Sequence, residues 1–500
     1  MISILLIWTI ILVCSIVIGK SVLMLLKLGG SNCKNEYDIW LVSGLCVTNL
    51  YAQIFSIFAK VGVLALSIYV LITVILAYYL NRCKELNFYK SVDISKKGRG
   101  FWLVLGIIIV ATLLWTNIVP QHYDTYLYHA QSIHWIEDYG VVKGLGNLHF
   151  RFAYNSALMP LQALFSFAWM GLGSAHAVNG FFTCFMLIFA LSRIVRDRQR
   201  LEISDIFAVG MMVYILYDSF HVSSPNTDTI ALLLVYYIIM KWQIYSEEGD
   251  SSYAGYALLC ILLVYATTIK LSVGIMVLLV VYPAFIMIKN GEVRSIIKSL
   301  IAGIVILIPY LFRNVITSGY LIYPYEVTGI SGIDWRMPES TLALDRAEII
   351  AWGRGNCNIS RNDEHIWQWF GEWFSSINAL WKLFFIITIV AIIAIAGMLI
   401  SGKRKSSVQT IVLISVSVCG IAFWLLTAPL PRYGTIYMIT LPCIAVGLLL
   451  QKEGALVAKK VMLLLKPVWV LSVVLYLVML PVYAYVNNCM GMSVFTQTGY

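Results

Sequence analysis

Long apolar runs separated by short polar segments dominate the chain. Four of the clearest reach or approach the roughly 20 residues that a helix needs to cross about 30 Å of hydrocarbon: residues 1–26, 101–120, 296–316 and 461–485. Further runs predict spanning helices at 203–222, 227–245, 253–269, 272–288, 378–400, 408–427 and 433–450. The first run lacks a basic segment before it and a small-residue cleavage site after it, so we expect it to be retained as a helix.

Clusters of Lys and Arg in the connections orient these helices. They fall at residues 81–100, 193–200, 289–298, 402–405 and 452–460, and the positive-inside rule places them in the cytoplasm. Residues 121–151 and 193–200 then lie on opposite sides, although two apolar runs, 154–171 and 174–191, separate them. The first of these runs is short and contains Pro160, so we expect it to dip into the membrane or lie on it, and the second to cross.

This orientation predicts about 14 crossings with both termini outside. It also places four polar stretches on one outer face, at residues 121–151, 223–226, 317–377 and 428–432.

Composition and charge then exclude other classes of protein. With 60% hydrophobic and 12% charged residues among 500, the chain has too little polar surface for water-soluble domains. The formal charge of +10 is spread over clusters between apolar runs, which indicates topology and contact with anionic lipids rather than nucleic acid. We therefore expect an all-α, polytopic transmembrane bundle in the cell membrane, with juxtamembrane helices and loops on the extracytoplasmic side and membrane lipids around it.

The cysteines indicate neither a metal site nor a defined disulfide. Most of the ten lie inside apolar runs, and no close pair has the spacing of metal ligands. Cys357 and Cys489 fall on the same predicted outer side, and the sequence leaves their pairing open.

Asp124 is the first candidate for chemistry. It follows directly on the apolar run 101–120, so its carboxylate is expected near the membrane surface, where partial loss of water makes a carboxylate a better proton acceptor. The alternative is a helix cap, because an amphipathic stretch, residues 125–139, follows. His129 lies in that stretch. It is either a surface histidine or a hydrogen-bonding partner of a substrate, because its spacing from His134 does not fit two zinc ligands on one helix face.

Further polar residues stand at the predicted outer ends of other helices. Asp228 follows a Pro-Asn turn; it either complements the helix dipole or faces the same cavity as Asp124. Lys270 interrupts two apolar runs, where it either snorkels or lines a cavity. Arg313 and Arg432 also fall at this boundary, and three cations at one rim suggest an anion site, because the Arg fork matches phosphate oxygens.

The predicted outer loop 318–377 is rich in Trp and Tyr, which are typical of a membrane-interface belt and also of sugar stacking. Tyr325, at the start of this loop, is a candidate for contact with substrate.

Several short motifs together resemble the bacterial branch of the C-type glycosyltransferase superfamily (GT-C), whose members use polyprenyl-phosphate-linked sugars. The resemblance lies in Tyr-Asp-Thr-Tyr-Leu-Tyr-His around Asp124, Gly-Leu-Gly-Asn-Leu-His at 144–149, Ser-Pro-Asn-Thr-Asp at 224–228, Thr-Ile-Lys-Leu-Ser at 268–272, Arg-Asn with Ser-Gly-Tyr-Leu-Ile-Tyr-Pro within 313–324, and Ala-Pro-Leu-Pro-Arg-Tyr at 428–433.

This resemblance implies that Asp124 is the catalytic base, which activates an acceptor hydroxyl to attack the anomeric carbon with inversion. It also implies that Lys270, Arg313 or Arg432 stabilises the departing lipid phosphate. The chain departs from relatives that carry two acids in this loop, so no cofactor is assigned and a divalent cation is left open.

Together these features predict four regions. They are amino-terminal helices of unknown role (1–100), a GT-C-like catalytic module (101–317) that includes the outer loop 121–153, an extracytoplasmic aromatic-rich loop (318–377) and carboxy-terminal helices (378–500). The predicted activity is sugar transfer from a polyprenyl-phosphate donor to a glycan or lipid-linked acceptor on the extracytoplasmic face. The alternatives are a flippase or transporter of lipid-linked glycans and a polysaccharide polymerase or ligase.

Overall fold

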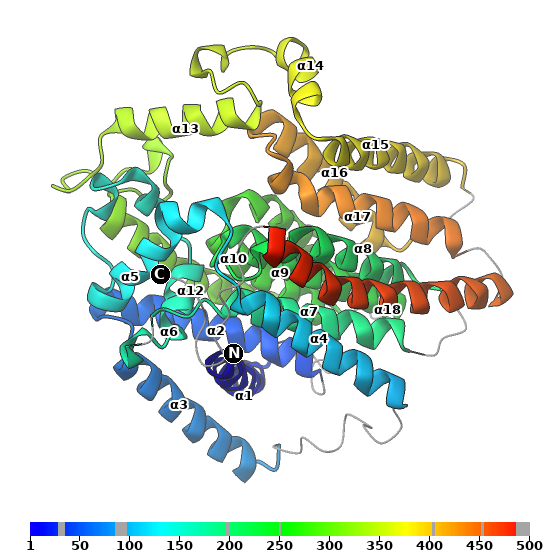
Figure 1. The fold of residues 1–500 in the computed structure, drawn as a ribbon, viewed down its shortest axis with the longest axis horizontal. Helices are drawn as coiled ribbons and strands as arrows, with labels where there is room; N and C mark the ends of the chain where they lie inside the picture. Colours follow the sequence, from blue (N-terminus) through cyan, green and yellow to red (C-terminus); the bar gives the residue numbers. More distant parts are fainter. Residues whose placement is uncertain are drawn as a thin grey trace.

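The protein is a bundle of helices. The computed structural model describes residues 1–28, 36–85, 98–171, 173–196, 201–249, 252–402, 406–451 and 455–486, and every regular element within these ranges is helical (Figure 1). Extended backbone pairs there only at an isolated bridge between Tyr320 and Gly329. The prediction of an all-α fold is therefore confirmed.

The helices fall into long and short groups. The long ones are α1 (Ile2–Leu26), α2 (Tyr37–Phe58), α3 (Val63–Arg82), α4 (Arg99–Asn117), α7 (Val178–Ile194), α8 (Ile203–Asp218), α9 (Thr227–Glu247), α10 (Tyr253–Ile269), α12 (Val293–Ser318), α15 (Ala379–Ile400), α16 (Val408–Thr427), α17 (Pro431–Leu450) and α18 (Ala455–Val486). The shorter ones include α5 (Ala130–Tyr139), α6 (Leu158–Leu164), α11 (Val281–Lys289), α13 (Glu339–Gly353), α14 (Ile366–Ser376), the π-helix η3 (Thr125–His129) and the 3₁₀-helices η5 (Phe150–Tyr154) and η8 (Leu271–Val280).

Many of these helices can cross a membrane. Among the described residues, twelve helices are long and apolar enough to do so, and three shorter apolar helices accompany them. This confirms a multi-pass membrane protein. The run 154–171 contains α6, whose seven residues reach only about 10 Å along a helix axis, in keeping with a segment that does not cross. The number of about 14 crossings stays a prediction.

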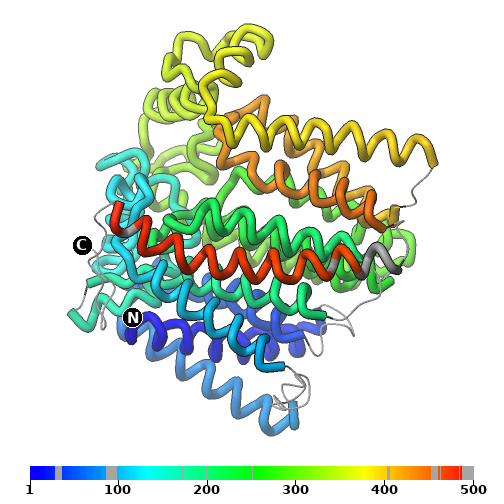
Figure 2. The backbone as a smooth tube through the Cα atoms, turned by 45° about the vertical axis from the view of Figure 1, so that its right-hand side comes forward, coloured from blue at the N-terminus to red at the C-terminus, as the bar shows by residue number. Residues whose placement is uncertain are grey.

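The connections are sorted to the two ends of the bundle. Figure 2 shows the long helices running side by side, with η3, α5, α13 and the link between α16 and α17 at one end, where Met1 also lies. The pairs α3 and α4, α7 and α8, and α15 and α16 approach one another at the opposite end. The expected polar stretches therefore share one end of the bundle, and its assignment to the extracytoplasmic side stays a prediction from the positive-inside rule.

The first two helices are packed tightly into the bundle. A Cβ on Gly44 would lie 1.8 Å from the Ser15 carbonyl oxygen, so the backbones of α1 and α2 approach closely at small residues. From α2, Asn49 donates a hydrogen bond of 3.1 Å to the hydroxyl of Tyr265 in α10. Helices α1 and α2 are therefore part of the packed bundle.

The aromatic-rich outer region folds into α13 and α14. In α14, Trp369 and Trp373 are buried, and the Trp373 ring lies 5.6 Å from that of Trp424 in α16. These side chains pack the outer region against the bundle. Cys357 in this region is exposed and forms no disulfide within the described residues; Cys489 lies outside the described residues.

Candidate functional site

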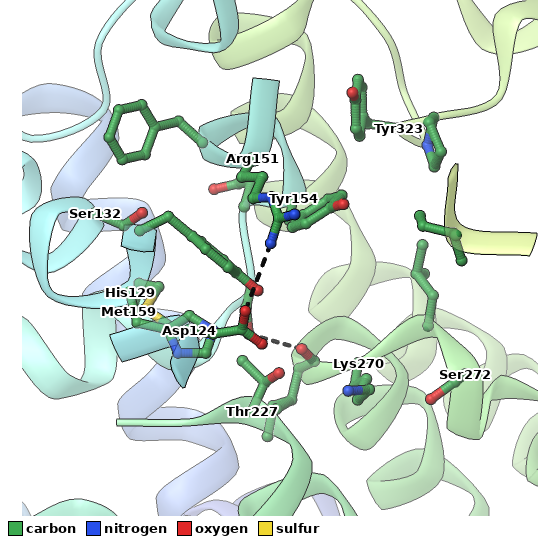
Figure 3. A pocket seen from close by; sticks show the side chains of 18 of the residues that line it. Asp124, His129, Ser132, Arg151, Tyr154, Met159, Thr227, Lys270, Ser272 and Tyr323 are labelled. Carbon is green, nitrogen blue, oxygen red and sulfur yellow. Dashed lines mark hydrogen bonds and ion pairs between the residues drawn. The ribbon is translucent and has the colours of Figure 1, made fainter. Parts of the chain in front are cut away.

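A cavity of about 530 Å³ opens at the end of the bundle that carries the polar stretches. Its walls come from η3 and α5, the segment around η5, the start of η8, the end of α12, helix α13 and the junction of α16 with α17. Figure 3 shows Asp124 near its centre, with Arg151 reaching it from one side and Lys270 and Thr227 close by. Segments far apart in sequence thus contribute to one chamber.

Asp124 is buried in this cavity and is not a helix cap. Its side chain is 8% exposed and caps no backbone N–H at the start of η3, which overturns the cap alternative. One carboxylate oxygen, Oδ1, lies 3.6 Å from Arg151 Nη1, and the other, Oδ2, lies 3.5 Å from Arg432 Nη1. The carboxylate is therefore held between two guanidinium groups that face the same cavity.

Asp228 lies behind the wall of the cavity. It is not among the lining residues, whereas Lys270 and Arg432 are. The Lys270 ammonium pairs with Asp228 Oδ1, and Arg432 Nη1 lies 3.8 Å from Asp228 Oδ2. Asn226 caps α9 instead, since its side chain accepts a 2.8 Å hydrogen bond from Thr229 N–H. Of the two alternatives for Asp228, the one in which it faces the cavity beside Asp124 is wrong. Asp228 lies in the first turn of α9, as the other alternative has it, and its carboxylate pairs with two cations that do face the cavity.

The ring of Tyr433 supports the same two cations. Lys270 Nζ lies 4.4 Å from the ring centroid and the Arg432 guanidinium carbon 5.3 Å from it. Both distances suit cation–π contacts, which hold charged groups in place without neutralising them. Of the two alternatives left open for Lys270, lining a cavity is the one that the structure shows.

Arg313 lines a different corner of the cavity. It is 2% exposed, and its guanidinium donates to Asn155 Oδ1 from Nε (3.2 Å) and Nη2 (2.8 Å) and to Ser56 Oγ from Nη1 (2.6 Å). The three expected rim cations therefore do not form one cluster: Lys270 and Arg432 lie together and Arg313 lies apart.

His129 is a buried residue of the cavity wall. It is 2% exposed, which overturns the alternative of a surface histidine, and neither ring nitrogen has a hydrogen-bond partner among the described residues. Burial, followed by the charge of nearby His122, lowers its pKa well below the ordinary value. The ring is thus neutral at pH 7, and both of its nitrogens are buried in the wall.

Aromatic residues line the cavity next to α13, and one of them pairs with an acid that does not line it. Tyr325 lines the cavity and is 49% exposed, so it is accessible as expected. The hydroxyl of Tyr154 donates a 2.9 Å hydrogen bond to Oδ1 of Asp345, a buried residue of α13 whose pKa is raised chiefly by burial. No residue of α14 lines the cavity, so its Trp residues do not stack on a ligand there.

A short segment around η5, residues 151–156, organises these walls, and the sequence analysis missed it. Arg151 pairs with Asp124, Tyr154 with Asp345, and Asn155 with Arg313, while Ser156 Oγ donates a 2.7 Å hydrogen bond to the carbonyl of Ile269, just before Lys270. One sequence signal could have indicated this segment: Arg151 lies in the same predicted outer loop as Asp124.

The described residues contain no group of three or more His, Cys, Asp or Glu side chains able to hold a metal ion. Near Asp124, both carboxylate oxygens already face guanidinium groups. The donor set at this carboxylate therefore fits an anion beside it better than a cation.

Fold and cavity define a multi-pass membrane protein with a charged chamber at one end of its helix bundle. The chain belongs to the family described as "Domain of unknown function (DUF8201)", whose family model matches residues 1–439. No curated protein and no solved structure matches it. The matched region includes the first hundred residues as well as every wall of the cavity.

Proposed function

We propose that this protein is a membrane glycosyltransferase that moves a sugar from a polyprenyl-phosphate-linked donor to a glycan or lipid-linked acceptor, in a cavity on the extracytoplasmic face. The observation that carries the proposal is the buried carboxylate of Asp124, placed inside a chamber between Arg151 and Arg432. This arrangement supplies a proton acceptor next to groups that bind phosphate, which are the two elements that such a transfer needs.

The charges of the cavity favour an anionic substrate. Six basic side chains and one acidic side chain, that of Asp124, line it; the basic ones are Arg151, Lys270, Arg313, Arg346, Arg354 and Arg432. Apolar side chains, among them Phe423 and Leu426 of α16, line it as well. A cationic chamber with apolar walls suits an amphiphile with a phosphate head and a hydrocarbon tail.

The reaction follows from these positions. Asp124 takes the proton of the acceptor hydroxyl as its oxygen bonds to the anomeric carbon. The bond from that carbon to the lipid-phosphate oxygen breaks, and its electron pair leaves on the phosphate, beside Lys270 and Arg432. Attack opposite the leaving group inverts the sugar configuration. Tyr325, which is half exposed and lines the cavity, is placed to hydrogen-bond the sugar or the acceptor.

The proposal is tested with purified protein and radiolabelled polyprenyl-phosphate sugars, by comparing wild type with Asp124→Asn. We expect the variant to lose about 10²–10⁴-fold in transfer rate, the usual contribution of a positioned general base. Asp138→Asn is the matched control, because Asp138 is exposed and does not line the cavity. Undiminished transfer by Asp124→Asn would remove Asp124 as the base. Absence of transfer with every donor, together with movement of labelled lipid across vesicles, would favour a flippase.

A further inference from the structure

Arg313 differs from the other buried cations of the described chain in having no carboxylate partner. Only three Lys or Arg residues there are buried to the same degree: Arg193, Lys241 and Arg313. Arg193 Nη2 lies within 3.7 Å of three carboxylates, those of Glu202, Asp205 and Glu247, and Lys241 Nζ lies 3.0 Å from both Glu36 and Asp38. Arg313 contacts only a neutral amide and a hydroxyl.

This arrangement is costly for folding. A buried charge without a counter-charge is strongly destabilising, and ionisable residues at such depth in membrane proteins usually line a cavity or find a partner. Arg193 and Lys241 have a counter-charge, which acidic side chains of the same chain supply. Arg313 instead borders the cavity, beside Tyr310 and Thr317, so a counter-charge can reach it from there.

Asn155 is the neutral residue that stands where an acid would neutralise Arg313. Its Oδ1 accepts two hydrogen bonds from the Arg313 fork, the position in which an aspartate would form a salt bridge. Its Nδ2 donates to Asn314 Oδ1 at 2.7 Å, which fixes the orientation of the amide. The backbone of Asn155 is left-handed, with φ of 41°, an uncommon conformation for a residue other than glycine that often marks functional sites.

Arg313 also lies outside the network of ion pairs that joins Asp124, Arg151, Arg432, Asp228 and Lys270, here called the Asp124 cluster. No ion pair joins Arg313 to Asp124, and Arg313 does not contact Asp228, the acid that Lys270 and Arg432 share. Its guanidinium instead donates hydrogen bonds to Asn155 and to Ser56 of α2. Neither Asp124 nor Asp228 therefore compensates the charge of Arg313.

We propose that Arg313, positioned by Asn155 and Ser56, forms a second oxyanion subsite, which binds a phosphate or carboxylate group of a substrate. The assignment to a substrate rests on the proposed glycosyltransferase function; the anion site itself does not. The oxyanion belongs either to a second phosphate of the donor or to an acidic group of the acceptor. In both cases it balances the charge that the chain leaves unpaired.

The first test uses inorganic phosphate as the probe. Thermal unfolding of the full-length protein in detergent is followed during a phosphate titration, with chloride at matched ionic strength as the blank. Asn155→Asp places a carboxylate against Arg313 with almost no change in size, and Arg313→Gln removes the charge. We expect both variants to need at least tenfold more phosphate for the same stabilisation, and Arg313→Lys to keep most of the response.

The control is Arg336→Gln, since Arg336 pairs with Glu339 at the surface and does not line the cavity. Without phosphate, we expect Asn155→Asp to unfold at a higher temperature than wild type, because the internal acid supplies a counter-charge to Arg313. A purely structural Asn155 predicts the reverse. Wild-type phosphate responses in Asn155→Asp and Arg313→Gln, or no response in the wild type, would overturn the subsite.

A second experiment identifies the source of the oxyanion. Transfer is measured with donors that carry one or two phosphates and with acceptors that have or lack an acidic group. We expect Asn155→Asp to raise KM about tenfold, either for the diphosphate donor alone or for the acidic acceptor alone. An unchanged KM for every substrate would overturn the assignment to a substrate. If wild type transfers no sugar, the proposed function fails, while the phosphate titration still decides whether the subsite exists.

Discussion

The ion pair between Lys270 and Asp228 gives the sharpest test of how the cavity wall is held. The two side chains are 16% and 17% exposed, so the pair is neither fully buried nor at the surface. Breaking a fully buried pair costs about 3–5 kcal/mol, whereas exposed pairs contribute about 0–1 kcal/mol. A loss between these limits is expected when one partner is removed.

The surroundings make the two single substitutions unequal. Lys270→Met leaves Asp228 with a second cation, because Arg432 Nη1 stays 3.8 Å from its Oδ2; we expect a loss of about 1–2 kcal/mol. Asp228→Asn removes the acid that both cations share and leaves Lys270 only the face of Tyr433; we expect about 2–4 kcal/mol. The double variant should recover part of this loss, with a coupling energy of about 1–2 kcal/mol.

Unfolding of the four proteins by a denaturing detergent, followed by Trp fluorescence, measures these differences, and the chain has 15 Trp residues to report on them. Additive losses would show that the pair does not stabilise the wall. A larger loss in Lys270→Met than in Asp228→Asn would contradict the shared role of Asp228.

Two further predictions concern positions near the cavity. Gly140→Ala should cost about 2–4 kcal/mol, because its φ is 80° and a Cβ would lie 2.5 Å from the Ser56 carbonyl oxygen; the same unfolding assay should show no loss for Gly106→Ala, where nothing lies within 4 Å. Burial lowers the pKa of His122 from 6.5 to about 4. As pH falls, His122 is therefore protonated at a higher pH in the unfolded chain than in the folded chain. The stability that the neutral ring contributes should be complete above about pH 6.5 and lost towards pH 4, by at most about 3 kcal/mol. Wild type should therefore lose more stability than His122→Asn over that window, and parallel pH profiles of the two proteins would refute this assignment.

The sequence was sufficient to predict the helical class and part of the cavity wall. A spanning helix can be recognised from its own apolar run alone, because each helix satisfies its backbone hydrogen bonds internally. Polar residues at the ends of such runs must emerge at one of two faces. The parity of the crossings therefore grouped Asp124, Lys270 and Arg432 before any packing was known, and all three line the cavity.

The predictions failed where side-chain direction decides the role. Asp228 and Asp124 occupy the same end of the bundle, yet one carboxylate faces the cavity and the other lies behind two cations. His129 follows Asp124 by five residues and reads as a surface residue, whereas the π-helical turn that contains it lies under other elements and buries it. These outcomes depend on packing against α9, α10 and α17, which local sequence patterns do not contain.

Arg432 connects the two acids of the Asp124 cluster, and this has a consequence for the proposed reaction. Its Nη1 lies 3.5 Å from Asp124 and 3.8 Å from Asp228, and its side chain is 42% exposed. A donor phosphate that binds this accessible guanidinium competes with Asp124 for it, since an Arg fork favours a phosphate's paired oxygens. Donor binding would thereby loosen the hold on the carboxylate at the moment when an acceptor hydroxyl needs it, while Lys270 and Arg151 keep the neighbouring charges in place.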